Sequence, residues 1–171
     1  LAAYPDRKCS VSLLHGDLSE GQMRGLYEHN KIKAMVNISH GEGFGLPLFE
    51  AARLGLPIIS IGWSGQTDFL SDKFLKVKHE LKTVQPQAAW DGVIQKDSQW
   101  AYADQGSFKM ALRMMHKKHD EFVEQAEKLQ DYVDTKFRDE VLFKGFVESI
   151  DEFEDPDAWL NDIEDIIKEY E

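Results

Sequence analysis

The sequence contains few of the residues that stabilise secreted domains or membrane spans. Cys9 is the one cysteine among 171 residues, so no disulfide can form within the chain. A lone cysteine favours a reducing compartment, and we interpret Cys9 as a small, inert residue. No apolar run approaches the roughly 20 residues that a transmembrane helix needs. These features favour a cytoplasmic protein without a transmembrane segment, with peripheral contact at a membrane surface as the alternative.

Positive charge is scarce and unevenly distributed. The chain has 20 Lys and Arg against 31 Asp and Glu, a net charge of −11. Residues 1–119 carry a net +3, whereas residues 120–171 carry a net −14. Because an acidic surface repels phosphate backbones, this distribution argues against nucleic acid as a partner. We interpret the acidic segment as solvent-exposed faces of helices.

Residues 40–50 form the most informative segment, H-G-E-G-F-G-L-P-L-F-E. We call residues 40–46 the glycine loop. Its glycines let the backbone approach a ligand closely, and Pro47 suits the first turn of a helix. A helix that begins here directs unpaired N–H groups and its positive dipole end at whatever lies in front of the loop. The segment therefore predicts a site for phosphate or sugar hydroxyls.

The flanking residues predict a βαβ unit. Residues 34–39 are short, apolar and partly β-branched, which indicates a strand buried on both faces. Residues 46–54 have a helical pattern that ends at Gly55 in the C′ position, and residues 57–61 form a second buried strand. The crossover should be right-handed.

Two carboxylates accompany the loop, Glu42 within it and Glu50 in the helix. The helix is so apolar that we expect other protein to cover it, and a carboxylate in that surface needs compensation. Glu50 can be a simple first-turn acid, favoured by the helix dipole. Alternatively, Glu42 and Glu50 face one cleft at the carboxyl end of the sheet, where open α/β sheets bind ligands. A nucleotide sugar has the hydroxyls and phosphates for such a site.

These motifs resemble the signature of retaining nucleotide-sugar glycosyltransferases of the GT-B architecture (group 1, family 4-like). The similarity rests on E-G-F-G-L-P at 42–47, E-A at 50–51 and G-L-P-I-I at 55–59. Residues 14–19 resemble the family's strand and glycine turn, and residues 64–68 its small-residue turn followed by an acid. The resemblance covers about residues 11–70 well and the helical remainder weakly.

The resemblance implies a role for each matched residue. Glu50 would hold the ribose of the donor and Glu42 would lie beside the donor sugar as the catalytic residue. Gly43 belongs to the donor-binding loop, and the N–H groups of Phe44, Gly45 and Leu46 would reach the sugar hydroxyls and the diphosphate. The reaction would be hexosyl transfer from a UDP- or GDP-sugar with retention. No cofactor or metal is expected, because helix termini and basic side chains neutralise the diphosphate.

The chain also departs from the family pattern. No glycine–arginine turn or following lysine that would grip the diphosphate precedes residue 11, and the chain opens without methionine. We expect a piece of a longer protein that lacks the N-terminal acceptor domain, with a saccharide or lipid as acceptor. This piece alone should have no transferase activity and should bind the donor weakly at best. An epimerase of the same architecture and a non-catalytic nucleotide-sugar-binding or assembly domain are the alternatives.

The rest of the chain reads as helices on an α/β domain. A capping box at Ser19–Gln22 predicts a helix to about residue 30, and residues 74–77 suggest a strand. Residues 90–100 look loop-like. Four apolar stripes with helical spacing follow, and we expect each to be core. They contain residues 108–115, 122–137, 141–150 and 159–170. We therefore predict a Rossmann-like donor-binding domain over residues 1–105, incomplete at its start, and a helical region over residues 106–171 packed on it.

Three further residues are candidates for the pocket. His40 and His15 each precede a glycine at an expected strand end, and for both we favour a structural role over ligand contact. Trp63 can line a sugar pocket or cover the core, with equal weight. His116 and His119 have a spacing that can hold a metal, but no third ligand is near them in sequence, so surface positions are the better interpretation.

Overall fold

The chain divides into two compact units, Leu1–Ile32 and Lys33–Glu171, and the computed structural model describes residues 6–151 of them. The first unit contains helix α1 (Glu20–Tyr27). The Ser19 hydroxyl accepts a hydrogen bond from the Gln22 N–H, and the Gln22 side chain accepts one from the Ser19 N–H. This confirms the predicted capping box, although the helix ends at Tyr27.

The strand that we expected before this helix does not form. Residues 11–15 are irregular, and the side chains of Val11, Leu13 and Leu14 are exposed. The prediction that His15 lies at a strand end is therefore wrong. An apolar run forms a stable strand only where a neighbour pairs with its backbone, and the described residues of this unit provide no such neighbour.

The second unit is built on a parallel sheet with the order β1-β2-β3. Its strands are β1 (Met35–Asn37), β2 (Ile58–Ile61) and β3 (Leu75–Val77). Helix α2 (Leu46–Arg53) connects β1 to β2, and Val36 pairs with Ile59 across them. The predicted βαβ unit is confirmed, and the α/β architecture is compatible with a Rossmann-like fold.

The two strands of the βαβ unit, β1 and β2, differ in how far their side chains are buried. Every residue of β2 is buried, as predicted, but Val36 in β1 is 40% exposed. The expectation that β1 is buried on both faces is therefore wrong. The buried core that includes Ile59, Ile61 and Val77 lies over β2 and β3, whereas β1 is at the edge of the described sheet. An apolar pattern alone does not distinguish an edge strand from a central one.

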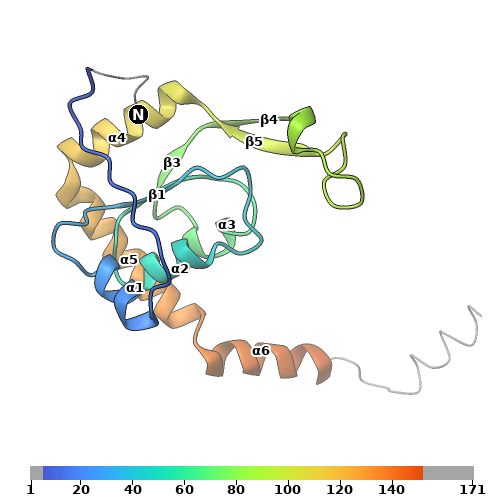
Figure 1. Ribbon diagram of the computed structural model, residues 1–171. Coiled ribbons are helices and arrows are strands. Elements are labelled where there is room, and N and C mark those ends of the chain that lie inside the picture. Colours follow the sequence, from blue (N-terminus) through green and yellow to red (C-terminus); the bar gives the residue numbers. More distant parts are fainter. Residues whose placement is uncertain (1–5, 152–171) are drawn as a thin grey trace, which may run out of the picture. The chain divides into compact units, whose positions relative to one another are not determined.

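A second, antiparallel sheet follows β3 (Figure 1). It consists of β4 (His79–Thr83) and β5 (Gln99–Ala103), with Leu81 opposite Ala101. A 3-10 turn, η1 (Pro86–Ala88), lies in the connection between them. Sequence analysis missed this hairpin and assigned residues 90–100 to a loop, because polar and charged residues interrupt the alternation that identifies strands.

Helices cover the parallel sheet. The short helix α3 (Thr67–Leu70) precedes β3, and α4 (Gln105–Lys117) and α5 (His119–Lys136) follow β5. Helix α4 packs against β3, and α5 packs against α2. The expected stripe is confirmed for α5, where Ala126, Leu129 and Val133 are buried. In α4, Ala111 and Met115 are buried as expected, but Leu112 is 41% exposed, so its place in the core stripe was predicted wrongly. The boundary at residue 105 stays a prediction.

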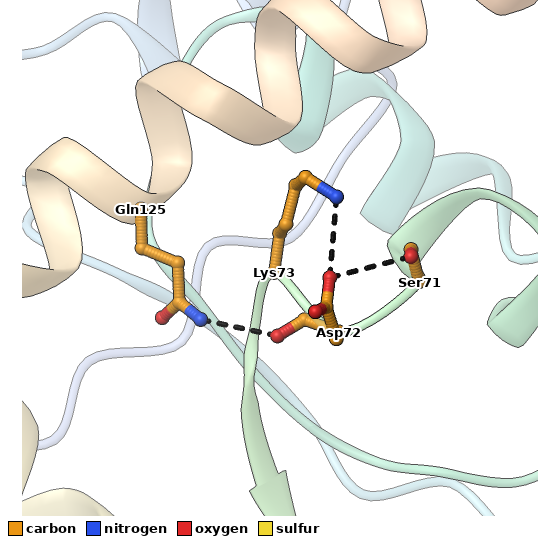
Figure 2. A network of polar contacts seen from close by, with 4 residues as sticks. All are labelled: Ser71, Asp72, Lys73 and Gln125. Atoms are coloured by element: carbon orange, nitrogen blue, oxygen red, sulfur yellow. Dashed lines mark hydrogen bonds and ion pairs between the residues drawn. The ribbon is translucent and has the colours of Figure 1, made fainter.

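Two glutamines of α5 bind backbone carbonyl groups of the α/β part. Gln125 Nε2 donates to the Asp72 carbonyl at 3.2 Å, beside the ion pair between Lys73 and Asp72 (Figure 2). The same lysine lowers the pKa of the Asp72 carboxyl group through a hydrogen bond and its charge. Gln130 Nε2 donates to the Arg53 carbonyl at 2.7 Å, where α2 ends. These bonds satisfy carbonyl groups that the preceding segments leave unpaired.

Helix α6 (Asp139–Asp151) is the exception among the helices. Its apolar side chains are all exposed, including Phe143 at 67%. The expectation that this stripe is core is therefore wrong for the structure of residues 6–151. The last predicted stripe, residues 159–170, lies outside the described residues. None of the described helices has the length and the hydrophobicity that a membrane span requires.

Candidate functional site

Two residues separate the glycine loop from β1, and the loop leads directly into α2. Gly45 is the N-cap of this helix and is left-handed, with φ +92°, a conformation that favours glycine. Pro47 lies in the first turn, as predicted. No side chain caps the helix, because glycine has none. The first turn of α2 therefore depends on something other than a capping side chain to satisfy its N–H groups.

The backbone N–H groups of Phe44, Gly45 and Leu46 donate to no atom of residues 6–151. Leu46 is the first residue of α2, so its N–H group lies at the positive end of the helix dipole, and the N–H groups of Phe44 and Gly45 directly precede it. The loop thus presents consecutive donors that can bind phosphate or hydroxyl oxygens.

The Glu42 carboxylate is held at the carboxyl end of β1. Its Oε1 atom accepts hydrogen bonds from Asn37 Nδ2 at 2.9 Å and from Ser39 Oγ at 2.7 Å. Asn37 is itself oriented by the Ser39 N–H, which donates to Asn37 Oδ1. Oε2 accepts no hydrogen bond from the described residues. One carboxylate oxygen therefore fixes the side chain, and the other can accept a bond from a ligand.

The loop rests on the turn between β2 and α3. The Glu42 carbonyl accepts bonds from Ser64 Oγ at 2.7 Å and from the Gly65 N–H at 3.0 Å. A Cβ atom on Gly65 would overlap the Gly43 carbonyl oxygen, so only glycine permits this approach. Sequence analysis identified residues 64–68 as a small-residue turn but did not predict that the turn supports the glycine loop.

The Phe44 side chain anchors the loop on its other side. Its ring lies 5.1 Å from the rings of both Phe49 and Phe69, and Phe137 completes the cluster. Phe69 is fully buried. The cluster joins the glycine loop to α2, to α3 and to the end of α5. The loop backbone is consequently fixed by packing as well as by hydrogen bonds.

The position of Glu50 differs from the expectation. We expected a carboxylate within a covered apolar helix, but Glu50 is exposed and has no hydrogen-bond or ion-pair partner in the described part of the chain. Leu46, one turn earlier on the same face, is 62% exposed. The apolar composition of α2 predicted that other parts of the protein pack on every face of the helix. Its buried face contains only Leu48, Ala51 and Ala52. Whether Glu50 and Glu42 share one pocket stays a prediction.

His40 contacts the backbone of β5. Its Nδ1 atom lies 2.8 Å from the Ala101 carbonyl oxygen, and its own carbonyl accepts from the Ala101 N–H at 3.1 Å. The ring lies between Trp100 and Tyr102, with centroids 4.8 and 4.5 Å away. This geometry agrees with a histidine hydrogen-bonded to backbone, the interpretation that the sequence favoured. Contact with a ligand stays a prediction.

The remaining candidates are less constrained. Trp63 is 38% exposed, and its ring lies 5.9 Å from that of His79. Its role at a sugar pocket stays a prediction. His15 is exposed in the first unit, and nothing places it at the site. His119 Nε2 lies 3.0 Å from the Lys33 carbonyl. Within residues 6–151, no three His, Cys, Asp or Glu side chains gather as metal ligands would.

Lys76 is a basic residue that sequence analysis did not single out. It lies in β3, and its methylene groups pass over Gly62, which follows the last residue of β2. A Cβ atom on Gly62 would overlap them. Lys76 forms no ion pair with the described residues. An unpaired cation therefore lies at the carboxyl end of the sheet, which a pattern in the sequence could not locate.

A known protein family matches the part of the chain that contains the glycine loop. Residues 22–146 match the family model described as family 4 glycosyltransferase in conflict systems. No curated protein and no solved structure matches the chain. The match covers most of the chain and includes the whole glycine loop, the βαβ unit and the hairpin. The resemblance to glycosyltransferases is confirmed at this level, and the chain belongs to the family 4 glycosyltransferases in conflict systems.

Proposed function

We propose that this chain carries the donor site of a retaining glycosyltransferase of the GT-B architecture, and that the site lies in front of the glycine loop. The observation that carries the proposal is the family match across residues 22–146, which include the unpaired N–H groups of Phe44, Gly45 and Leu46. The donor class is a nucleotide-diphosphate sugar, with UDP or GDP as its nucleotide.

Each group of the loop has a chemical task in this proposal. The N–H groups at the start of α2 bind the diphosphate, and the helix dipole stabilises the negative charge that develops as the diphosphate departs. Glu42, held through Oε1, accepts a hydrogen bond from a sugar hydroxyl at Oε2. Glu50 projects from the exposed face of α2 and binds the ribose hydroxyls.

Lys76 adds positive charge at the same edge of the sheet. Its ammonium group binds the diphosphate together with the N–H groups of the glycine loop. The proposed site therefore neutralises the diphosphate with backbone and side-chain groups, without a metal ion. The acceptor, a saccharide or a lipid, binds outside this site.

Nucleotide binding tests the proposal. UDP and GDP are titrated into the full chain by calorimetry, with ligand-observed NMR to detect weak binding. We expect one nucleotide to bind, with chelation by EDTA leaving its affinity unchanged. Glu50→Gln should weaken binding roughly tenfold to a hundredfold, because it replaces a charge-assisted hydrogen bond worth about 1.5–3 kcal/mol.

Glu127→Gln is the matched control, because Glu127 is an exposed glutamate of α5 without a side-chain partner among residues 6–151. It should leave nucleotide affinity unchanged. Failure of both nucleotides to bind would overturn the proposal. Equal affinity of wild type and Glu50→Gln would remove Glu50 from it. The expectation that this segment alone does not turn over donor is tested by its consumption of UDP- and GDP-sugars.

A further inference from the structure

His40 joins the β4–β5 hairpin to the glycine loop. The two are 61 residues apart in sequence, yet His40 uses both its carbonyl group and its ring on the backbone of Ala101. Ala101 is fully buried, and it lies in the hydrophobic core with Ile61 and Val77. The loop is thereby tied to a rigid part of the second unit.

The contacts of the His40 ring determine its tautomer. The Ala101 carbonyl can only accept a hydrogen bond, so Nδ1 carries the proton, and Nε2 of the neutral ring is unprotonated. Trp100 stacks on the ring with an interplanar angle of 11°, and Tyr102 covers it at 52°. The two aromatic side chains thus hold the imidazole in the plane that the hydrogen bond requires.

A second anchor holds the loop two residues later. Ser64 and Gly65 bind the Glu42 carbonyl, and the Glu42 N–H donates to Ser64 Oγ at 3.3 Å. The unpaired N–H groups of Phe44, Gly45 and Leu46 follow within four residues. His40 and Glu42 are therefore hydrogen-bonded anchors that precede the groups that we assign to the diphosphate.

We propose that His40 is a positioning residue: it clamps the glycine loop to β5, and the hairpin sets donor affinity through this clamp without contacting the donor. The effect of the clamp on donor affinity rests on the proposed function. The clamp itself concerns the geometry of the loop, which can be measured without any ligand.

Amide hydrogen exchange of the full chain tests the clamp. Two variants break it in different ways: His40→Ala removes the ring, and Trp100→Ala removes the stacked partner. Both should speed exchange of the Glu42 and Gly65 N–H groups roughly tenfold, because the loop opens more often. Trp90→Ala is the matched control, since Trp90 lies in the same hairpin, is 67% exposed and has no ring contact with His40.

Two replacements separate the parts of the clamp. His40→Asn retains a donor for the Ala101 carbonyl but loses the stacked ring, whereas His40→Phe retains a ring but loses the donor. The variant that keeps the more important contact, either the hydrogen bond or the stacked ring, should have amide exchange rates and UDP or GDP affinity closer to those of wild type. The control Trp90→Ala should keep the thermal midpoint of wild type. Donor affinity should fall roughly tenfold in His40→Ala.

Unchanged exchange at Glu42 and Gly65 in both His40→Ala and Trp100→Ala would overturn the clamp. Faster exchange with wild-type nucleotide affinity would overturn its role in donor binding. If the wild-type chain binds neither nucleotide, the proposed function fails, but the exchange rates still decide whether His40 positions the loop.

Discussion

Gly65 shows how a single hydrogen atom in place of a side chain shapes this site. The residue donates its N–H to the Glu42 carbonyl, and its α-carbon lies against the Gly43 carbonyl oxygen. Backbone meets backbone here, so no flexible side chain can move aside for a Cβ atom. The close approach holds the glycine loop in the conformation that leaves the N–H groups of Phe44, Gly45 and Leu46 unpaired.

We predict that Gly65→Ala destabilises the chain by about 1–3 kcal/mol, because the added methyl group forces the two loops apart. Urea unfolding followed by circular dichroism measures the change. Gly145→Ala is the control: a Cβ atom there meets nothing, and alanine should stabilise the interior of α6 by up to about 1 kcal/mol. Equal stability of Gly65→Ala and wild type would contradict the close approach.

Residues with local conformational demands were predictable from the sequence. Gly45 and Gly55 are left-handed, and Pro47 lies in a first turn, since these roles follow from the residue type and a few neighbours. The partners of Glu42 and Gly65 were not predictable. They come from segments whose proximity depends on the sheet, and spacing along the chain does not encode it.

At the scale of elements, the contact between α2 and α5 is specified by more than apolar packing. Gln130 donates to the Arg53 carbonyl, and Gly55 leaves room for the same glutamine, whose Oε1 lies 2.9 Å from the place of a Cβ atom. Helix α5 therefore binds the end of α2 at the point where its carbonyl groups lack helical partners.

We expect Gln130→Ala to cost about 1 kcal/mol of the free energy of unfolding, since the Arg53 carbonyl loses its donor. Differential scanning calorimetry should show a lower midpoint. Gln87→Ala, an exposed glutamine in η1 without a side-chain contact to any described residue, should leave the midpoint unchanged. A midpoint equal to that of wild type for Gln130→Ala would mean that water replaces this bond at no cost.

The order of elements was predictable where periodicity is strong. The βαβ unit and the helices α4, α5 and α6 follow from apolar spacing, whereas the hairpin does not. Strand β4 has the sequence H-E-L-K-T, with a single large apolar residue. Tertiary contacts determine which strand it pairs with, and the hydrogen bonds between His40 and Ala101 of β5 are an example. Intrinsic strand propensity is a weak predictor for such a strand.

At the scale of the whole molecule, periodicity identifies an apolar face but not what covers it. The stripes of α5 and α6 look alike in sequence, yet α5 buries Ala126, Leu129 and Val133 while α6 buries none of its described side chains. The difference lies in what each helix contacts. Helix α5 packs against α2, and its first residue, His119, contacts the Lys33 carbonyl two residues before β1, whereas the described side chains of α6 are all exposed.

This arrangement predicts that the folded core does not need the apolar side chains of α6. Phe143 and Phe146 are 67% and 64% exposed, so replacing both with serine removes little buried area. The thermal midpoint should shift by no more than about 1–2 °C, the range of ordinary surface substitutions. Phe69→Ser, at a fully buried position of the aromatic cluster, should by contrast lower the free energy of unfolding by about 3–5 kcal/mol.

The double variant should also aggregate less, because an exposed apolar patch is lost while the acidic charge of residues 120–171 is retained. A large fall in its midpoint would show that α6 contributes to the core of the folded chain, and the exposed stripe would then need a covering surface within the same molecule.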